Sequence, residues 1–111
     1  MANIPDDFVN YKSTTVWSKE TVPKTFLHDH NTRAGVYGRI CVLSGSLKFT
    51  GFVERRGEVD QEVIIAPGEF AVATPQYWHK VEFLGDDTQF KIEFFAQKDS
   101  DIVAQSLSER D

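Results

Sequence analysis

Three histidines are the residues whose type and spacing best fit a chemical function. His28 and His30 are separated by one residue, and His79 lies about 50 residues further along the chain. Side chains two residues apart on a β-strand point to the same side, so the first two could present their imidazoles to one cation. Three histidine ligands with an open position suit Zn²⁺, whereas two histidines and a carboxylate suit Fe²⁺. The spacing therefore predicts a divalent-metal site (Zn, Ni, Fe or Mn) on these three residues.

The segments around the histidines have the pattern of short β-strands separated by turns. Apolar and polar residues alternate in several runs, most clearly in 89–94, and glycine or proline marks the turns. Helical patterns do not separate the strands, which excludes a parallel βαβ architecture. Strands are predicted over 35–44, 47–53, 61–65, 70–74, 79–84 and 89–94. They would form a barrel over 24–96, preceded by an extended N-terminal arm over 1–23.

One short helix is predicted at the end of the sequence, over 99–109. Asp99 or Ser100 is a suitable N-cap for it. Three apolar residues would form its buried stripe: Ile102, Val103 and Leu107. A length of 111 residues fits one domain. We therefore expect a single all-β domain, a sandwich or barrel, with a short C-terminal helix.

Composition narrows the possible partners. The net charge is −5, and the basic doublet Arg55–Arg56 lies among acidic residues, which argues against nucleic-acid binding. The longest apolar runs fall short of the roughly 18 residues of a membrane span, and a secretory signal is not visible. The single cysteine, Cys41, fits a reducing cytoplasm. A glycine-rich fingerprint after a strand is missing, so we expect no nucleotide cofactor.

Strand parity predicts which residues line a pocket near the histidines. Gly38 and Ile40 should face inward from the strand that follows His30. Trp78 is next to His79 and could wall the pocket, and Phe94 could reach it from the last strand. The predicted pocket residues are Gly38, Ile40, Trp78 and Phe94.

Two polar residues share the opposite face of that first strand. Arg39 could clamp an oxyanion, but parity favours an ion pair at an edge or interface. Cys41 could be a reactive thiol, but a small buried or interface residue is the more common role. We therefore place both residues outside the pocket.

Two segments resemble the sequence motifs of the cupin superfamily. Residues 28–45, HDHNTRAGVYGRICVLSG, resemble the first motif, and residues 68–83, GEFAVATPQYWHKVEF, resemble the second. The three histidines fall on motif histidines, while a glycine or alanine stands where the first motif has glutamate. The resemblance implies a small jelly-roll barrel, or double-stranded β-helix, with three histidine ligands in place of the usual four-ligand set.

A longer stretch, from residue 4 to about 96, resembles the cupin-like N-terminal domain family of tellurite-resistance protein B. The segments TRAGVYGRICVLSGSLKFTGF, GEFAVATPQYWHKVE and TQFKIEFF carry this resemblance. In some members the domain precedes a SAM-dependent methyltransferase domain, for which this sequence has no room. The resemblance implies a link to tellurite or oxyanion stress, without methyl transfer by this chain.

Three functions are compatible with these patterns. The first is a metal-binding cupin, with water or an oxyanion at the open positions of a Lewis-acidic metal. The second is a non-enzymatic module that binds a small molecule or oxyanion, or docks on a separate methyltransferase. The third is a structural domain with inert histidines. Whether a reaction is catalysed is left open, and uncovered strand edges together with the arm favour a homodimer.

Overall fold

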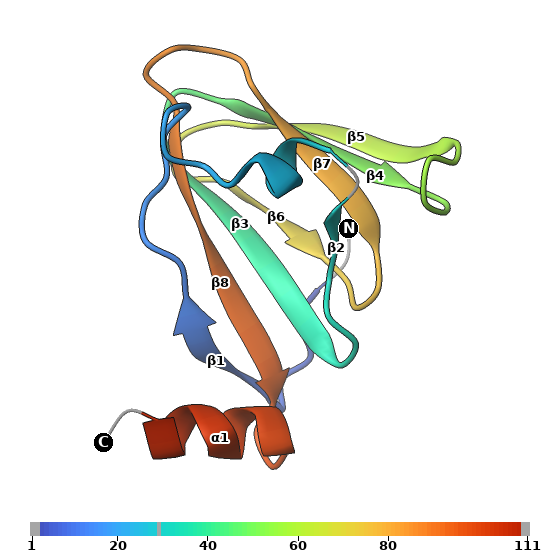
Figure 1. Cartoon of the computed structure of the whole chain (residues 1–111), viewed down its shortest axis with the longest axis vertical. Coiled ribbons are helices and arrows are strands. Elements are labelled where there is room, and N and C mark those ends of the chain that lie inside the picture. The colour runs from blue at the N-terminus through green and yellow to red at the C-terminus, as the bar shows by residue number, and fades with distance from the viewer. Residues whose placement is uncertain (1–2, 29, 110–111) are drawn as a thin grey trace.

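Two antiparallel four-stranded sheets face each other and form the body of the protein (Figure 1). This computed structural model describes residues 3–28 and 30–109, excluding the side chains of 107–109. The strands are β1 (Phe8–Ser13), β2 (His30–Asn31), β3 (Val36–Ser44), β4 (Leu47–Phe52), β5 (Val59–Ile65), β6 (Phe70–Ala73), β7 (Trp78–Phe83) and β8 (Gln89–Gln97). One sheet has the order β1-β8-β3-β6, and the other has β2-β7-β4-β5. The prediction of an all-β fold is confirmed.

The hydrophobic core lies between the two sheets. Every second residue of β3 is buried, so Ile40 and Val42 are only 1% and 2% exposed. Phe49 of β4 and Phe90 of β8 meet them from other strands and are fully buried. Burying such side chains stabilises the fold by about 1.5–3 kcal/mol each. The period-two pattern of the sequence thus determines which face of each strand packs inward.

The N-terminal segment is part of the main sheet. Strand β1 pairs antiparallel with β8 of the same chain, with Phe8 opposite Gln97. Further along, Trp17 forms an isolated bridge with Phe90. We expected an extended arm that could cross to a partner, and residues 8–13 are instead an edge strand of this chain's own sheet. The pairing satisfies backbone groups of β8 that would otherwise be unpaired.

The C-terminal helix α1 (Asp101–Glu109) begins close to the predicted position. Ser100 is its cap, since its Oγ accepts a hydrogen bond from the backbone N–H of Val103 at 3.4 Å. Val103 is buried, and Ser106 Oγ donates to the carbonyl of Tyr11 on β1 at 2.7 Å. The side chain of Leu107, also predicted for the apolar stripe, is outside the described part. The helix covers the end of β1 and β8 (Figure 1).

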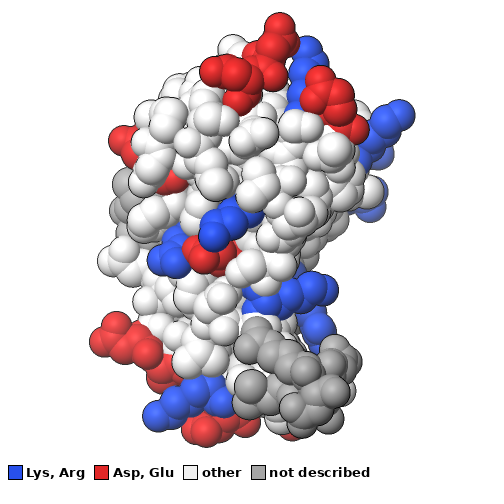
Figure 2. All heavy atoms as spheres, turned by 90° about the vertical axis from the view of Figure 1, so that its left-hand side faces the viewer, with Lys and Arg blue, Asp and Glu red and all other residues white. Residues whose placement is uncertain are grey.

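The surface view in Figure 2 shows side chains of both charges interspersed on a mostly uncharged face. Within the described residues, the one α-helix is far too short to cross a bilayer.

Candidate functional site

A cavity of about 220 Å³ lies between the two sheets. Strands β3, β6 and β8 supply one wall, and β2, β7 and the segment after β2 supply the other. A 3₁₀ turn, η1 (Lys24–Leu27), adds Phe26. The lining residues are Phe26, His30, Asn31, Thr32, Arg33, Gly38, Ile40, Ala73, His79, Ile92 and Phe94. Most of this lining is apolar, and the polar groups gather on the side of β2 and β7.

His30 and His79 meet in the wall of this cavity. The two residues are direct partners in the pairing of β2 with β7, strands that lie side by side in Figure 1. His30 Nδ1 and His79 Nε2 are 3.2 Å apart, a hydrogen-bond distance. The pair joins positions that are 49 residues apart in the sequence.

His28, the third predicted ligand, lies elsewhere. It caps the 3₁₀ turn η1 with an irregular backbone, is exposed, and is not among the residues that line the cavity. The same-face rule requires a continuous strand through both positions, and here the strand begins only at His30. Phe26 lies beside His30 instead, with the two rings stacked and their centroids 4.0 Å apart. The structure therefore corrects the predicted grouping of His28 with His30.

The predicted metal site has two of its three ligands together. Within residues 3–28 and 30–109, no group of three or more His, Cys, Asp or Glu side chains is arranged to hold a metal ion. Catalytic zinc sites in proteins use three protein ligands, and the described residues bring together two, His30 and His79.

Hydrogen-bond partners determine where the protons of the histidine pair lie. The carbonyl oxygen of Tyr77 lies 2.8 Å from His79 Nδ1 and can only accept, so that nitrogen carries the hydrogen. In the neutral ring, His79 Nε2 is then an acceptor, and His30 Nδ1 must donate to it. His30 Nε2 is left as an unprotonated acceptor. It is the one ring nitrogen of this pair without a described partner.

Burial keeps both imidazoles neutral. His79 is 3% exposed, and burial lowers its pKa to about 4, against the upward effect of its hydrogen bond to the Tyr77 carbonyl. Burial also lowers the pKa of His30. Removing an imidazolium from water is costly, so the neutral form dominates near pH 7. The neutral tautomers inferred from the hydrogen bonds are therefore the relevant ones.

Thr32 contributes an unpartnered polar group to the same wall. The residue is 4% exposed and lines the cavity, and its Oγ1 has no hydrogen-bond partner among the described residues. Its backbone is held in place, because its carbonyl accepts a hydrogen bond from Gln76 N–H at 2.8 Å. A buried hydroxyl without a partner costs about 1–3 kcal/mol, so Thr32 carries a local energetic cost in the free protein.

Tyr77 and its neighbours position His79. The Tyr77 hydroxyl donates to Asp60 at 2.6 Å and accepts from Gln61 at 3.2 Å. Its ring lies over Gly51, where any Cβ would overlap the tyrosine. Burial and the hydrogen bond to Asp60 raise the pKa of Tyr77 to about 12. The side chain is thus anchored, which holds the carbonyl that orients His79.

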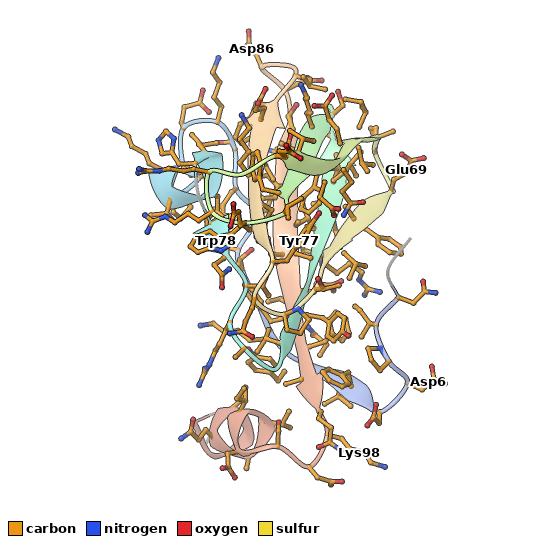
Figure 3. All side chains as sticks on the ribbon, turned by 90° about the vertical axis from the view of Figure 1, so that its right-hand side faces the viewer. Asp6, Glu69, Tyr77, Trp78, Asp86 and Lys98 are labelled. Carbon is orange, nitrogen blue, oxygen red and sulfur yellow. The ribbon has the colours of Figure 1, made fainter. Side chains whose placement is uncertain are left out.

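Three of the four predicted pocket residues line the cavity: Gly38, Ile40 and Phe94. Trp78 does not. Figure 3 shows it beside Tyr77, where the chain enters β7. Because His79 points inward, its strand neighbour Trp78 lies on the other face, where the Arg55 guanidinium is 5.4 Å from its ring centroid. Adjacency to His79 in sequence was therefore the wrong criterion for Trp78.

Several lining residues escaped the sequence analysis. Thr32 lies two residues after His30, so strand periodicity could have placed it on the same side. Ile92 alternates with Phe94 on β8 and follows the same rule. Phe26 and Arg33 carried no local signal, because a 3₁₀ turn and a loop bring them to the cavity.

The predicted placement of Arg39 and Cys41 away from the pocket matches the structure. Neither lines the cavity. Arg39 donates from two nitrogens to Glu93 Oε1, at 2.9 and 2.7 Å, and its guanidinium lies between Phe70 and Phe95. Cys41 Sγ lies 3.4 Å from the same carboxylate oxygen.

Two known bacterial proteins are similar to this chain in sequence. The uncharacterized protein YeaR of Escherichia coli K12 is 40% identical over 99 residues, which cover 86% of this chain and 83% of that protein. A probable S-adenosyl-L-methionine-dependent methyltransferase, TehB of Haemophilus influenzae, is 32% identical over 94 residues. The match covers 85% of this chain but 33% of TehB, so the chain corresponds to about a third of that protein.

Solved structures agree with the sequence relatives. A crystal structure of an Escherichia coli K12 protein superposes with a TM-score of 0.81 at 39% identity, covering 86% of this chain and 97% of the other. The crystal structure of Haemophilus influenzae TehB gives a TM-score of 0.76 at 37% identity, covering 84% of this chain and 32% of the other. The TehB-like domain family matches residues 12–92, which include His30, Thr32 and His79. On this evidence, the chain belongs to the TehB-like domain family.

Proposed function

We propose that this protein is a binding module that holds a small molecule in the cavity between its sheets. The observation that carries the proposal is the cavity of about 220 Å³, which has the His30–His79 pair in its wall. A mostly apolar cavity with a few polar groups on one side is the usual form of a small-molecule site. The polar groups would orient the ligand, and the apolar wall would supply most of the affinity.

The histidine pair would act by hydrogen bonding. Both imidazoles are neutral, and the fixed tautomers offer a lone pair at His30 Nε2. An acid catalyst near pH 7 needs a proton that it can donate, and burial disfavours that form here. These features favour hydrogen-bond acceptance by His30 over acid catalysis.

The family gives this binding a setting, which we also propose. Tellurite-resistance protein B links the domain to tellurite or oxyanion stress, and a relation to the cupin superfamily accounts for its jelly-roll form. We expect the chain to work in the cytoplasm, alone or with a separate methyltransferase. A homodimer is supported by β5 and β6 at the sheet edges, where Ile64 and Phe70 are 55% and 47% exposed.

A divalent metal is the second candidate, favoured by one distance. Two nitrogens bound to tetrahedral zinc at 2.0–2.1 Å lie about 3.3 Å apart, close to the 3.2 Å between His30 and His79. A metal held by these two histidines would supply Lewis acidity. The bound small molecule would have to provide the remaining metal-coordinating atoms. Elemental analysis of untagged protein, wild type beside His30→Ala, tests this candidate. About one metal per chain, lost in the variant, would support it, and a metal content near zero after incubation with Zn²⁺, Ni²⁺ and Fe²⁺ would reject it.

The main proposal is tested by filling the cavity. A Cβ added at Gly38 would make ordinary contacts with Ile92, Ala73 and Phe94, so a larger side chain there would extend into the cavity. Ligand-observed NMR with a small-fragment collection, in the presence of a chelator, should detect binders to the wild type that Gly38→Leu no longer binds. Equal binding to both proteins, with the variant folded by circular dichroism, would contradict the proposal.

A further inference from the structure

Arg33 lies at the mouth of the cavity. It belongs to the connection between β2 in one sheet and β3 in the other, where the chain descends from β2 and turns into β3 (Figure 1). Its carbonyl accepts a hydrogen bond from the Val36 N–H at 3.1 Å, which closes that turn. Arg33 is exposed and is also part of the cavity lining. It therefore stands where the space between the sheets meets solvent.

A second hollow, of about 200 Å³, adjoins the cavity at this point. Arg33 and Phe94 line both spaces, and Tyr11, Lys12 and Val36 complete the lining of the second. Strand β1 brings Lys12 opposite Phe94 in the β1–β8 pairing. Burial raises the pKa of Tyr11 and the charge of Arg33 opposes that rise, so the guanidinium lies near the Tyr11 phenol. The side chain of Arg33 is thus on the rim shared by the two spaces.

The charge at this rim is positive only. The chain has 17 acidic and 12 basic residues, yet Arg33 and Lys12 line the two spaces without any aspartate or glutamate among the described residues. Neither cation forms an ion pair with another described residue. Arg39, by contrast, is held by two hydrogen bonds to Glu93. A local excess of positive charge on an acidic protein favours an anionic group in the ligand.

The interior of the cavity favours an apolar body for that ligand. Ile40, Ile92 and Phe94 supply carbon surface, and the volume of about 220 Å³ exceeds the roughly 150 Å³ of an engineered cavity that binds benzene. His30 Nε2 is an acceptor, and a carboxylate has no hydrogen to give to it. An anionic group is therefore favoured at the mouth, where Asn31 of the same lining offers amide donors.

We propose that the cavity binds a small organic carboxylate whose apolar body is about the size of a benzene ring. The body packs on Ile40, Ile92 and Phe94, and the carboxylate lies at the mouth beside Arg33 and Asn31. A guanidinium can hold a carboxylate through two parallel hydrogen bonds. This inference rests on the proposed function and names the ligand class for the same cavity.

The test compares four probes by isothermal titration calorimetry at low ionic strength with a chelator present: benzoate, benzamide, acetate and tellurite. Benzamide has the same body with a neutral head, acetate is the head with almost no body, and tellurite is an oxyanion without one. Benzoate should bind most tightly. Added salt should weaken benzoate and leave benzamide unchanged, because salt screens exposed charges.

Arg33→Gln removes the charge at the mouth and keeps a polar side chain. It should weaken benzoate by about fivefold, the value of an exposed ion pair, and leave benzamide unchanged. Arg55→Gln is the matched control, because Arg55 lines neither of the two spaces. It makes the same change of charge elsewhere and should leave both affinities unchanged. The order of the probes on the wild type needs no variant, so it tests the inference even if Arg33→Gln does not fold.

The outcomes separate this inference from the proposed function. Binding of benzamide, acetate or tellurite as tightly as benzoate would overturn the carboxylate inference and leave the cavity as a binding site. An unchanged affinity for benzoate in folded Arg33→Gln would do the same, and so would failure of all four probes while the fragment screen yields other binders. Failure of all four probes together with an empty fragment screen would overturn both.

Discussion

Strand β3 separates two regions that treat their polar groups in opposite ways. On its outer face, Arg39 and Cys41 are both hydrogen-bonded to Glu93 of the neighbouring strand β8. On its inner face, Gly38 and Ile40 line the cavity opposite the histidine pair and Thr32. The Thr32 hydroxyl has no partner among the described residues. One region is a closed network, and the other has an unused donor and an unused acceptor.

The difference teaches which region stabilises the fold and which is available for function. Burial alone would raise the pKa of Glu93, but hydrogen bonds from Arg39 and Cys41 outweigh it and lower that pKa. The outer network therefore satisfies its charges internally. On the inner side, the Thr32 hydroxyl carries the energetic cost of a buried polar group without a partner among the described residues. Substitutions should consequently have opposite effects on the two faces.

Acid should produce the largest change, and it should act through the inner face. The pKa of His79 is near 6.5 when unfolded and about 4 when folded, so the unfolded state binds more protons between these values. Stability from this residue is complete above pH 6.5 and is lost as the pH falls towards 4, by about 3 kcal/mol. Urea unfolding at a series of pH values from 7.5 to 4, with chelator present, measures this loss of stability.

The control for the acid effect is His79→Gln, which cannot titrate in this range. Its stability should fall less steeply than that of the wild type between pH 6.5 and 4. Parallel curves for the two proteins would show that His79 is not responsible.

Breaking the outer network should have the next largest effect. Glu93→Ala leaves Arg39 and Cys41 without their shared acceptor and should destabilise the protein by about 2 kcal/mol. Denaturant unfolding at pH 7.5 gives the value, and Glu93→Gln, which keeps an acceptor oxygen, should lose less. Affinity for cavity ligands should not change, and a loss of binding in folded Glu93→Gln would erase the contrast between the faces.

Removing the unpartnered hydroxyl should raise the free energy of unfolding, whereas breaking the outer network lowers it. Thr32→Val replaces a buried oxygen without a partner by a methyl group of similar shape, and should stabilise the free protein by up to about 1 kcal/mol. Thermal unfolding without ligand provides the measurement. Destabilisation by more than that amount would indicate that Thr32 already has a partner in the free protein.

Gly38→Ala should have the smallest effect. The added Cβ would contact Ile92, Ala73 and Phe94 at 3.6 to 4.0 Å, ordinary packing distances. Loss of glycine flexibility in the unfolded chain should stabilise the protein by about 0.4–1 kcal/mol. Chemical unfolding beside the wild type tests this, and a clear destabilisation would mean that the wall at Gly38 is tighter than the structure shows.

Much of the fold was predictable because strand patterns are local. Alternation located β3, β4, β7 and β8 and correctly turned Gly38 inward and Arg39 outward. Two strands were missed. The β1 segment alternates weakly, and the two-residue β2 is too short to show a period.

The site divides in the same way. The sequence by itself determined that His79 begins a strand and that Ile40 and Phe94 face the interior, because side-chain direction follows from the period of two. Only the tertiary structure decided that His30 faces His79, that His28 stays outside, and that Thr32 ends without a partner. These outcomes depend on the register between strands that are distant in sequence and on the space between the two sheets. The local sequence pattern specifies neither of them.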